Sequence, residues 1–264
     1  MKIFVTGSTG FVGSHFVNAA LCAGHSLVCL RRPGSQPRVN LEREPEWQVG
    51  SLEDDWREVL QSCDTFVHLA AHSTNVPYDT LGNCLYWNLT VALRLMEQVL
   101  EVGIQNVLVA GTGFEYGRSG ERYEYIPVTA PLEPTMSYPA SKAAAAIALT
   151  QWAIEHHIKL NYLRIFQVFG VGEAESRLWP SLHEAALAGD DFQLTPGNQV
   201  RDFTPVEDVA QQLLNALDFS KVQAGEPLIK HIGTGCPQTL REFAEHWWKY
   251  WNAKGTLHFG AYSY

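Results

Sequence analysis

The 264-residue sequence has no apolar run long enough to cross a bilayer. It starts with a β-prone run and not with a basic region followed by an apolar one, so we expect no secretory leader. Positive charge is in deficit: the formal net charge is −9, which argues against general binding to nucleic acids or anionic membranes. We therefore expect a cytoplasmic protein with neither as a partner.

Cysteine is scarce, and its positions are scattered. The chain has Cys22, Cys29, Cys63, Cys84 and Cys236, an odd number with no metal-ligand spacing and no disulfide framework. We expect no metal site and a reducing compartment. Cys22 and Cys29 lie in apolar runs, which predicts that both are small buried hydrophobes.

A glycine-rich turn follows the first apolar run. Residues 2–6 are β-prone, Gly7, Gly10 and Gly13 come next at intervals of three, and a helical pattern begins within the motif. Glycine lets the chain turn sharply and lets backbone N–H groups approach a pyrophosphate closely. A helix N-terminus also offers unpaired N–H groups to phosphates. The alternative is an ordinary strand–helix turn, and the position as first strand of an alternating pattern favours dinucleotide binding.

Short apolar strands alternate with helices along the first two thirds of the chain. Strands are predicted at 2–6, 26–30, 47–49, 65–69, 106–110 and 160–165, and helices at 11–23, 54–61, 81–102 and 138–156. This order predicts βαβ units in an α/β fold with a doubly wound parallel sheet of the Rossmann type.

The texture changes after Phe169. Helices are predicted at 178–188, 206–217 and 240–251, and strands at 192–194, 199–203 and 228–232. We assign 1–169 to a dinucleotide-binding domain and 170–264 to a smaller C-terminal α/β substrate lobe, with segments around 205–235 returning to the main domain.

Arg31 and Arg32 end the second predicted strand. An acidic residue there would bind the 2′-hydroxyl of NAD, whereas arginine suits the 2′-phosphate of NADP. Because no acid is present and a guanidinium can grip a phosphate with two bonds, we predict NADP, with NAD as the alternative. Solvated loop charges are the other interpretation.

Tyr138 and Lys142 stand four residues apart in a predicted helix, so they share one face. A phenol, with an ordinary pKa of about 10, is a poor acid–base catalyst at neutral pH. A nearby ammonium favours the phenolate and lowers that pKa. Together with the glycine motif, this pair indicates proton transfer beside a dinucleotide.

These motifs closely resemble the extended short-chain dehydrogenase/reductase family, the NAD(P)-dependent epimerase/dehydratase group that acts on nucleotide sugars. The resemblance covers nearly the whole chain. It is carried by residues 6–13, 67–71 and 112–117, by Asn88, by Tyr138 with Lys142, and by residues 201–210.

The resemblance implies a role for each matching residue. Tyr138 exchanges a proton with a sugar oxygen, Lys142 assists it and binds the nicotinamide ribose, and Thr112 hydrogen-bonds the same oxygen. The residues expected to bind the cofactor are Gly7, Thr9, Gly10, Phe11, Val12, Gly13, Arg31, Arg32, Ser51, Leu52, Leu69, Ala70, Ala71, Asn88, Tyr138 and Lys142. The residues expected to bind the substrate are His72, Gly113, Phe114, Gln167 and Arg201, the last one contacting the diphosphate.

Departures from the family pattern narrow the chemistry. Nucleotide-sugar 4,6-dehydratases carry Asp-Glu directly after the catalytic threonine, where this chain has Gly113 and Phe114. We therefore do not expect a 4,6-dehydratase, and Glu115, one place further on, is no substitute. Gln167 replaces a common asparagine near the sugar nucleotide, and Ser51 replaces an aspartate that often touches adenine.

A reductase of NDP-4-keto-6-deoxyhexoses is the preferred interpretation. Residues 114–117 and 177–182 look like such reductases, and NADP suits reduction. A nucleotide-sugar epimerase is the alternative. A regulatory protein that binds a dinucleotide without catalysis is a third, although such relatives usually lack the Tyr/Lys pair. In the family the helices near 81–102 and 138–156 form a two-fold interface, so we expect a homodimer.

Overall fold

The computed structural model describes residues 1–262. Contacts between residues divide the chain into two compact units. The first contains Met1–Ile165 and Val209–Ile232, and the second contains Phe166–Asp208 and the chain from Gly233 onward. Such contacts do not test whether either part folds by itself, so the domains 1–169 and 170–264 stay predictions.

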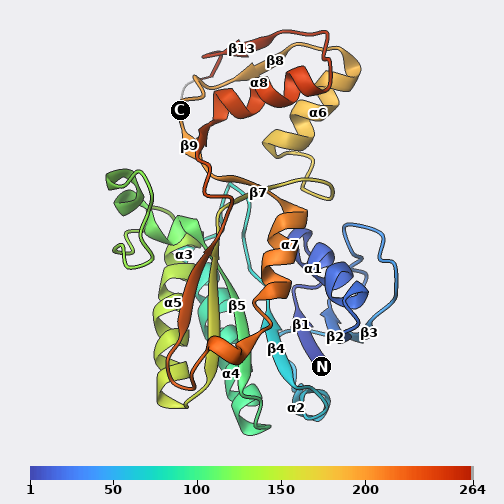
Figure 1. The fold of residues 1–264 in the computed structure, drawn as a ribbon, viewed down its shortest axis with the longest axis vertical. Helices are drawn as coiled ribbons and strands as arrows, with labels where there is room; N and C mark the ends of the chain where they lie inside the picture. The colour runs from blue at the N-terminus through green and yellow to red at the C-terminus, as the bar shows by residue number, and fades with distance from the viewer. Residues whose placement is uncertain (263–264) are drawn as a thin grey trace. The chain divides into compact units, whose positions relative to one another are not determined.

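A seven-stranded parallel sheet forms the first unit (Figure 1). Its strands are β1 (Lys2–Thr6), β2 (Ser26–Arg31), β3 (Glu46–Val49), β4 (Thr65–His68), β5 (Asn106–Thr112), β6 (Lys159–Ile165) and β11 (Leu228–Ile232). They lie in the order β11-β6-β5-β4-β1-β2-β3, which confirms the predicted doubly wound α/β fold. The order reverses between β1 and β4, where Thr6 pairs with His68, so ligands are expected outside the carboxyl ends of these two strands.

Helices cover both faces of this sheet because the strand residues alternate between two buried sides. One core lies between the sheet and α2 (Arg57–Leu60), α4 (Ala92–Glu101) and α5 (Ser137–Glu155). α1 (Phe11–Cys22) follows β1 and packs against β2, and its buried side chains include Phe16, Val17 and Ala20. The sheet therefore carries the glycine turn at the carboxyl end of β1, which lies between β4 and β2.

The predicted helix 81–102 is three pieces. α3 (Leu81–Leu85) begins at Thr80, whose hydroxyl caps Asn83 N, and α4 follows a π-helix over Tyr86–Val91. A π-helix is wider than an α-helix and often marks a functional site. Here Asn88 is buried within it.

Short paired strands and two helices build the second unit. The helices are α6 (Leu178–Ala188) and α8 (Leu240–Tyr250); the strand pairs are β7 (Gln167–Phe169) with β10 (Phe203–Pro205), β9 (Val200–Arg201) with β12 (Gln238–Thr239), and β8 (Phe192–Leu194) with β13 (Leu257–Phe259). α7 (Val206–Asn215) follows β10 and leads back into the first unit.

The first unit also contains short 3₁₀ turns at Gly113–Tyr116, Arg118–Arg122 and Phe219–Lys221.

The single strand predicted at 199–203 is wrong, because β9 and β10 separate at Asp202. Its carboxylate accepts hydrogen bonds from Thr234 N and Gly235 N, at 2.9 and 2.8 Å, and from the Thr204 hydroxyl at 3.2 Å. These bonds hold a turn where the apolar pattern alone suggested one strand.

The two cysteines predicted to be buried differ. Cys29 is buried in β2, and burial raises the pKa of its thiol to about 12. Cys22 is exposed, with its Sγ 3.2 Å from Glu42, so that prediction was wrong. It is the last residue of α1. Among residues 1–262 no helix is long and apolar enough to span a membrane.

Candidate active site

The glycine turn is packed too tightly for side chains. Gly7 has φ +72°, and a Cβ there would lie 2.5 Å from Ala70 N. A Cβ on Gly13 would lie 2.0 Å from Gly7 O. Gly10 N donates to Gly7 O at 3.0 Å, which closes the turn. β1, the turn and the loop after β4 are thus in direct backbone contact at the switch point.

α1 begins at this turn without a side-chain cap. Its N-cap residue is Gly10, and Phe11, Val12 and Gly13 form the first turn. The first N–H groups of a helix have no partners within the helix, and its positive dipole end favours anions. A tight backbone turn without side chains and an uncapped helix N-terminus both fit a pyrophosphate, so the residues present are suited to a dinucleotide.

The segment after β2 folds against the glycine turn. The Thr9 and Ser35 hydroxyls are 2.8 Å apart, and Arg38 N donates to the Ser14 hydroxyl. Arg31 lies over the Trp47 ring, 4.6 Å from its centroid, and Arg32 is exposed. Arg31 ends β2 and Arg32 begins the segment that borders the turn. Their contact with the ribose stays a prediction.

Ser51 and Leu52 follow β3. Ser51 N donates to Asp54 at 2.7 Å, and Ser51 O accepts from the Trp56 indole at 2.9 Å. Leu52 is partly buried against the main core. The bonds fix the backbone of this loop, while the predicted contact with adenine stays a prediction.

The end of β4 carries a buried histidine. His68 Nδ1 lies 2.8 Å from the Thr6 hydroxyl, which links β4 to β1. Burial, with a smaller contribution from the positive charge of Lys142, lowers the pKa of His68 to about 3. The imidazole is therefore neutral at physiological pH. Leu69, Ala70 and Ala71 continue from it beside Gly7, and Leu69 N donates to Thr6 O.

Asn88 hydrogen-bonds two parts of the first unit. Its Oδ1 accepts from His72 N at 2.7 Å, and its amide donates to His72 O at 3.1 Å and to the Ser141 hydroxyl at 2.9 Å. It joins the loop after β4 to α5. Its predicted contact with the cofactor stays a prediction.

Thr112, the last residue of β5, caps the 3₁₀ turn Gly113–Tyr116. Its hydroxyl accepts from Phe114 N at 3.3 Å. Thr112 is 7% exposed, Gly113 is half-buried and the Phe114 ring is 39% exposed. The hydroxyl thus lies at the carboxyl end of the sheet, on the strand next to β4.

Tyr138 and Lys142 lie in the first turns of α5, which packs against β5, β6 and the Gly113–Tyr116 turn. Both are buried, at 8% and 3% exposure. Lys142 Nζ donates to Ala110 O at 2.8 Å, two residues before Thr112 on β5. This bond fixes the lysine under the end of β5 and brings the predicted catalytic residues into one region.

The loop after β4 supplies His72 and, unforeseen from the sequence, Tyr78. His72 Nε2 is 2.8 Å from Asp79, and the pKa of that carboxyl is lowered by this hydrogen bond. The Tyr78 ring centroid lies 5.4 Å from that of Tyr138. No signal in the sequence pointed to this contact, because the two tyrosines lie 60 residues apart and only the fold brings their rings together.

Gln167 and Arg201 belong to the second unit. Gln167 begins β7 and pairs with Phe203 of β10; Arg201 ends β9 and pairs with Gln238. Arg201 Nη1 donates to Val200 O at 2.7 Å. Their contact with a substrate stays a prediction.

A buried ion pair behind Thr112 was also missed. Glu115 Oε2 accepts from Arg164 Nε at 2.7 Å, and their side chains are 0% and 5% exposed. The signal was an arginine inside the apolar strand 160–165, since a charge there needs a buried partner. Both Glu115 oxygens accept hydrogen bonds from protein groups. That Glu115 is no substitute for the Asp-Glu pair stays a prediction.

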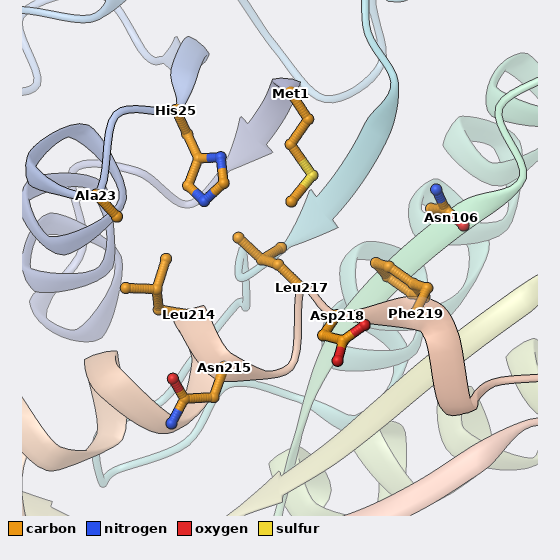
Figure 2. Close-up of a pocket in the computed structure, with 9 residues that line it drawn as sticks. All are labelled: Met1, Ala23, His25, Asn106, Leu214, Asn215, Leu217, Asp218 and Phe219. Atoms are coloured by element: carbon orange, nitrogen blue, oxygen red, sulfur yellow. The ribbon is translucent and has the colours of Figure 1, made fainter.

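An open pocket of about 700 Å³ lies away from these residues (Figure 2). It is lined by Met1, Ala23, His25, Asn106, Leu214, Asn215, Leu217, Asp218 and Phe219. Met1 and Asn106 lie at the starts of β1 and β5, so the pocket is at the amino ends of parallel strands, opposite the glycine turn. It is not part of the candidate site.

A doubly wound sheet, a glycine turn and a Tyr–Lys helix define a dinucleotide-binding enzyme of the short-chain dehydrogenase/reductase type. The model of the NAD dependent epimerase/dehydratase family matches residues 3–229, and the chain belongs to this family. Its site is accordingly that of an NAD(P)-dependent enzyme.

Relatives of known activity match nearly the whole chain. UDP-glucose 4-epimerase from Corynebacterium glutamicum is 28% identical, over 93% of this chain and 79% of its own. CDP-abequose synthase from Salmonella muenchen is 25% identical, over 98% of this chain and 84% of its own. Among solved structures, MoeE5 in complex with UDP-glucose and NAD is 25% identical with a TM-score of 0.83, covering 98% of this chain and 85% of that one.

Proposed function

We propose that the protein is an NADP-dependent oxidoreductase that reduces the keto group of an NDP-4-keto-6-deoxyhexose. The observation that carries the proposal is the burial of Tyr138 and Lys142 one helical turn apart, with Lys142 bonded to β5 just before Thr112. Those three residues are what proton transfer to a carbonyl oxygen requires.

In this mechanism Tyr138 donates the proton. Its phenol gives a proton to the sugar oxygen as the carbonyl carbon is reduced, and takes another from solvent afterwards. The Lys142 ammonium favours the phenolate that is left behind. Thr112 hydrogen-bonds the same oxygen and stabilises negative charge that develops there. His72, Gly113, Phe114, Gln167 and Arg201 are proposed to contact the substrate.

A nicotinamide dinucleotide, when bound, supplies the hydride. The backbone of Gly7, Gly10 and Gly13 and the uncapped start of α1 would hold its pyrophosphate. Arg31 and Arg32 support NADP, because the segment they begin is hydrogen-bonded to Thr9 of the turn through Ser35. The family match supports NAD(P) in general, so this preference rests on the arginines.

A nucleotide-sugar 4-epimerase is the second candidate. The observation that favours it is that the UDP-glucose 4-epimerases from Corynebacterium glutamicum and Streptomyces lividans, at 28% and 29%, are slightly more similar to this chain than CDP-abequose synthase. An epimerase oxidises and re-reduces one sugar carbon, so the same Tyr138 would take and return the proton.

The test is a screen of NDP-4-keto-6-deoxyhexoses with NADPH. The reaction is monitored through the absorbance of NADPH. We expect net consumption of NADPH with at least one substrate and a loss of about 10²-fold or more in Tyr138→Phe. Tyr125→Phe, at an exposed tyrosine outside the site, is the matched control and should retain the wild-type rate.

Two other outcomes decide against the reductase. Interconversion of UDP-sugars without net NADPH consumption, by protein that keeps its nicotinamide through dialysis, would establish the epimerase. No turnover with any keto sugar or UDP-sugar, with NADPH still bound, would leave a regulatory dinucleotide-binding protein. Tighter binding of NAD than of NADP would refute the role of Arg31 and Arg32.

A homodimer is part of the proposal. α5 exposes Ile147 and Ile154, at 65% and 42%, and α3 exposes Leu81 at 50%. Exposed apolar side chains on neighbouring helices suit a two-fold helix interface.

A further inference from the structure

Glu115 is a buried charge shared by several groups of the active-site region. Its Oε1 accepts from Thr112 N at 2.8 Å and from the Tyr162 hydroxyl at 2.8 Å, and its Oε2 accepts from Arg164 Nε at 2.7 Å. Gly111 makes room for it, since a Cβ there would lie 2.7 Å from Glu115 Oε1. A fully buried carboxylate with three partners is held in one position.

Arg164 is held equally firmly on its other side. Its Nη1 donates to the Tyr116 hydroxyl at 2.7 Å and to Val128 O at 3.1 Å, and its guanidinium lies 4.7 Å from the Tyr116 ring centroid. The Tyr116 hydroxyl is 2.6 Å from His231 Nε2 on β11. The arginine therefore fixes the carboxylate from behind, between β6 and the turn after β5.

Glu115 also acts on Lys142. Lys142 Nζ donates to Ala110 O at 2.8 Å, and Glu115 Oε1 accepts from Thr112 N at 2.8 Å, so both buried charges are held by the same end of β5. The Tyr162 hydroxyl that donates to Glu115 also lies 3.4 Å from the backbone carbonyl of Lys142. Burial lowers the pKa of Lys142, and the negative charge of Glu115 opposes this effect.

The other groups around Lys142 give it little compensation. His68 on β4 is neutral and would repel the ammonium if protonated. Burial and the charge of Glu115 raise the pKa of Tyr162 on β6, so that phenol stays neutral. Tyr138, one turn before Lys142 on α5, is the proton donor itself, and Arg164 on β6 is positive.

We propose that Glu115 is a positioning residue for proton transfer: it is the counter-charge that keeps the buried Lys142 ammonium charged, and it holds the backbone of Thr112 in place. This inference rests on the proposed function for its catalytic meaning. In this proposal Glu115 itself transfers no proton and does not contact the substrate. Both of its oxygens accept hydrogen bonds from protein groups.

The experiment observes Lys142 directly. The sequence has seven lysines, so the Cε resonances of ¹³C-lysine protein can be followed through a pH titration, with Lys142 assigned by its absence in Lys142→Met. In Glu115→Gln we expect the proton affinity of Lys142 to be at least about tenfold lower than in wild type. Glu115→Asp, which keeps the charge, should restore most of the difference.

Two further variants keep the test decisive. If Glu115→Gln does not fold because Arg164 is left unpaired, the double change Glu115→Gln with Arg164→Met removes both buried charges. The proton affinity of Lys142 should then change in the same direction but by less, because the positive charge of Arg164 is lost as well. Glu133→Gln is the matched control: it removes an exposed carboxylate that pairs with Arg122 in the same region, and Lys142 should titrate as in wild type.

The outcome separates the inference from the proposed function. Lys142 titrating in the folded Glu115 variants as in wild type would overturn the inference, whatever the enzyme's activity. Where turnover is found, the alkaline limb of the kcat profile should move to lower pH in Glu115→Gln, with KM little changed. An absence of turnover in wild type would refute the proposed function and leave the titration result standing.

Discussion

The amide of Asn88 donates to the hydroxyl of Ser141 at 2.9 Å, and Ser141 in turn donates to Tyr138 O at 2.8 Å. The π-helix that contains Asn88 is thereby tied to the first turn of the helix that carries Tyr138 and Lys142. Because Asn88 also binds both backbone polar atoms of His72, one side chain holds two borders of the site.

Replacing Asn88 by alanine should damage the site more than the fold. The change leaves buried polar groups of His72 and Ser141 without this partner, which costs about 1–3 kcal/mol of unfolding free energy. We expect kcat to fall more than KM rises, since α5 and the loop lose their common support. Urea unfolding and steady-state kinetics measure both.

Asn83→Ala is the control for that change. Asn83 is exposed on α3, and its amide donates to the Asp79 carboxylate at 3.1 Å. It should unfold and turn over nearly as wild type. Equal losses in the two variants would contradict a special role of Asn88.

Gly13→Ala should disrupt the glycine turn. The added Cβ would meet Gly7 O at 2.0 Å, and neither backbone can move freely. We expect about 1–3 kcal/mol of destabilisation from overpacking, and weaker binding of NADPH in a fluorescence titration. Gly82→Ala in α3 is the control, since its Cβ would meet nothing within 4 Å, and alanine should stabilise that helix by up to about 1 kcal/mol.

Local spacing explains what the sequence predicted well. The glycine turn and the Tyr138/Lys142 pair are each defined within seven residues, and alternating apolar runs were enough to predict the order of strands and helices. Glu115 and Arg164 were missed because they lie 49 residues apart, and only the pairing of β5 with β6 brings them together. Hydrophobic periodicity also could not distinguish the π-helix at Tyr86–Val91 from the α-helix around it.

His68 should make the protein sensitive to acid. Its pKa is about 3 in the folded protein, against an ordinary value near 6.5. Between these pH values the unfolded chain binds the proton and the folded one does not, so stability is present above pH 6.5 and is lost as the pH falls toward 3. The slope contributed by one such group approaches about 1.4 kcal/mol per pH unit.

His68→Gln should flatten that part of the stability profile. Glutamine can still hydrogen-bond the Thr6 hydroxyl and carries no titrating group. Urea unfolding between pH 7 and pH 4 measures the difference, with His246→Gln, at an exposed histidine on α8, as control. An unchanged pH dependence in His68→Gln would show that the histidine is not held neutral by burial.

Ile147→Glu should separate the proposed homodimer. Ile147 is 65% exposed in the middle of α5, and a glutamate placed opposite its own copy across a two-fold axis would be desolvated beside a like charge. Light scattering on a sizing column should then give the monomer mass for the variant and the dimer mass for wild type. Leu187→Glu, at a 73% exposed leucine on α6, is the control and should remain dimeric. A dimer that survives Ile147→Glu and dissociates in Leu187→Glu would move the interface from α5 to the second unit.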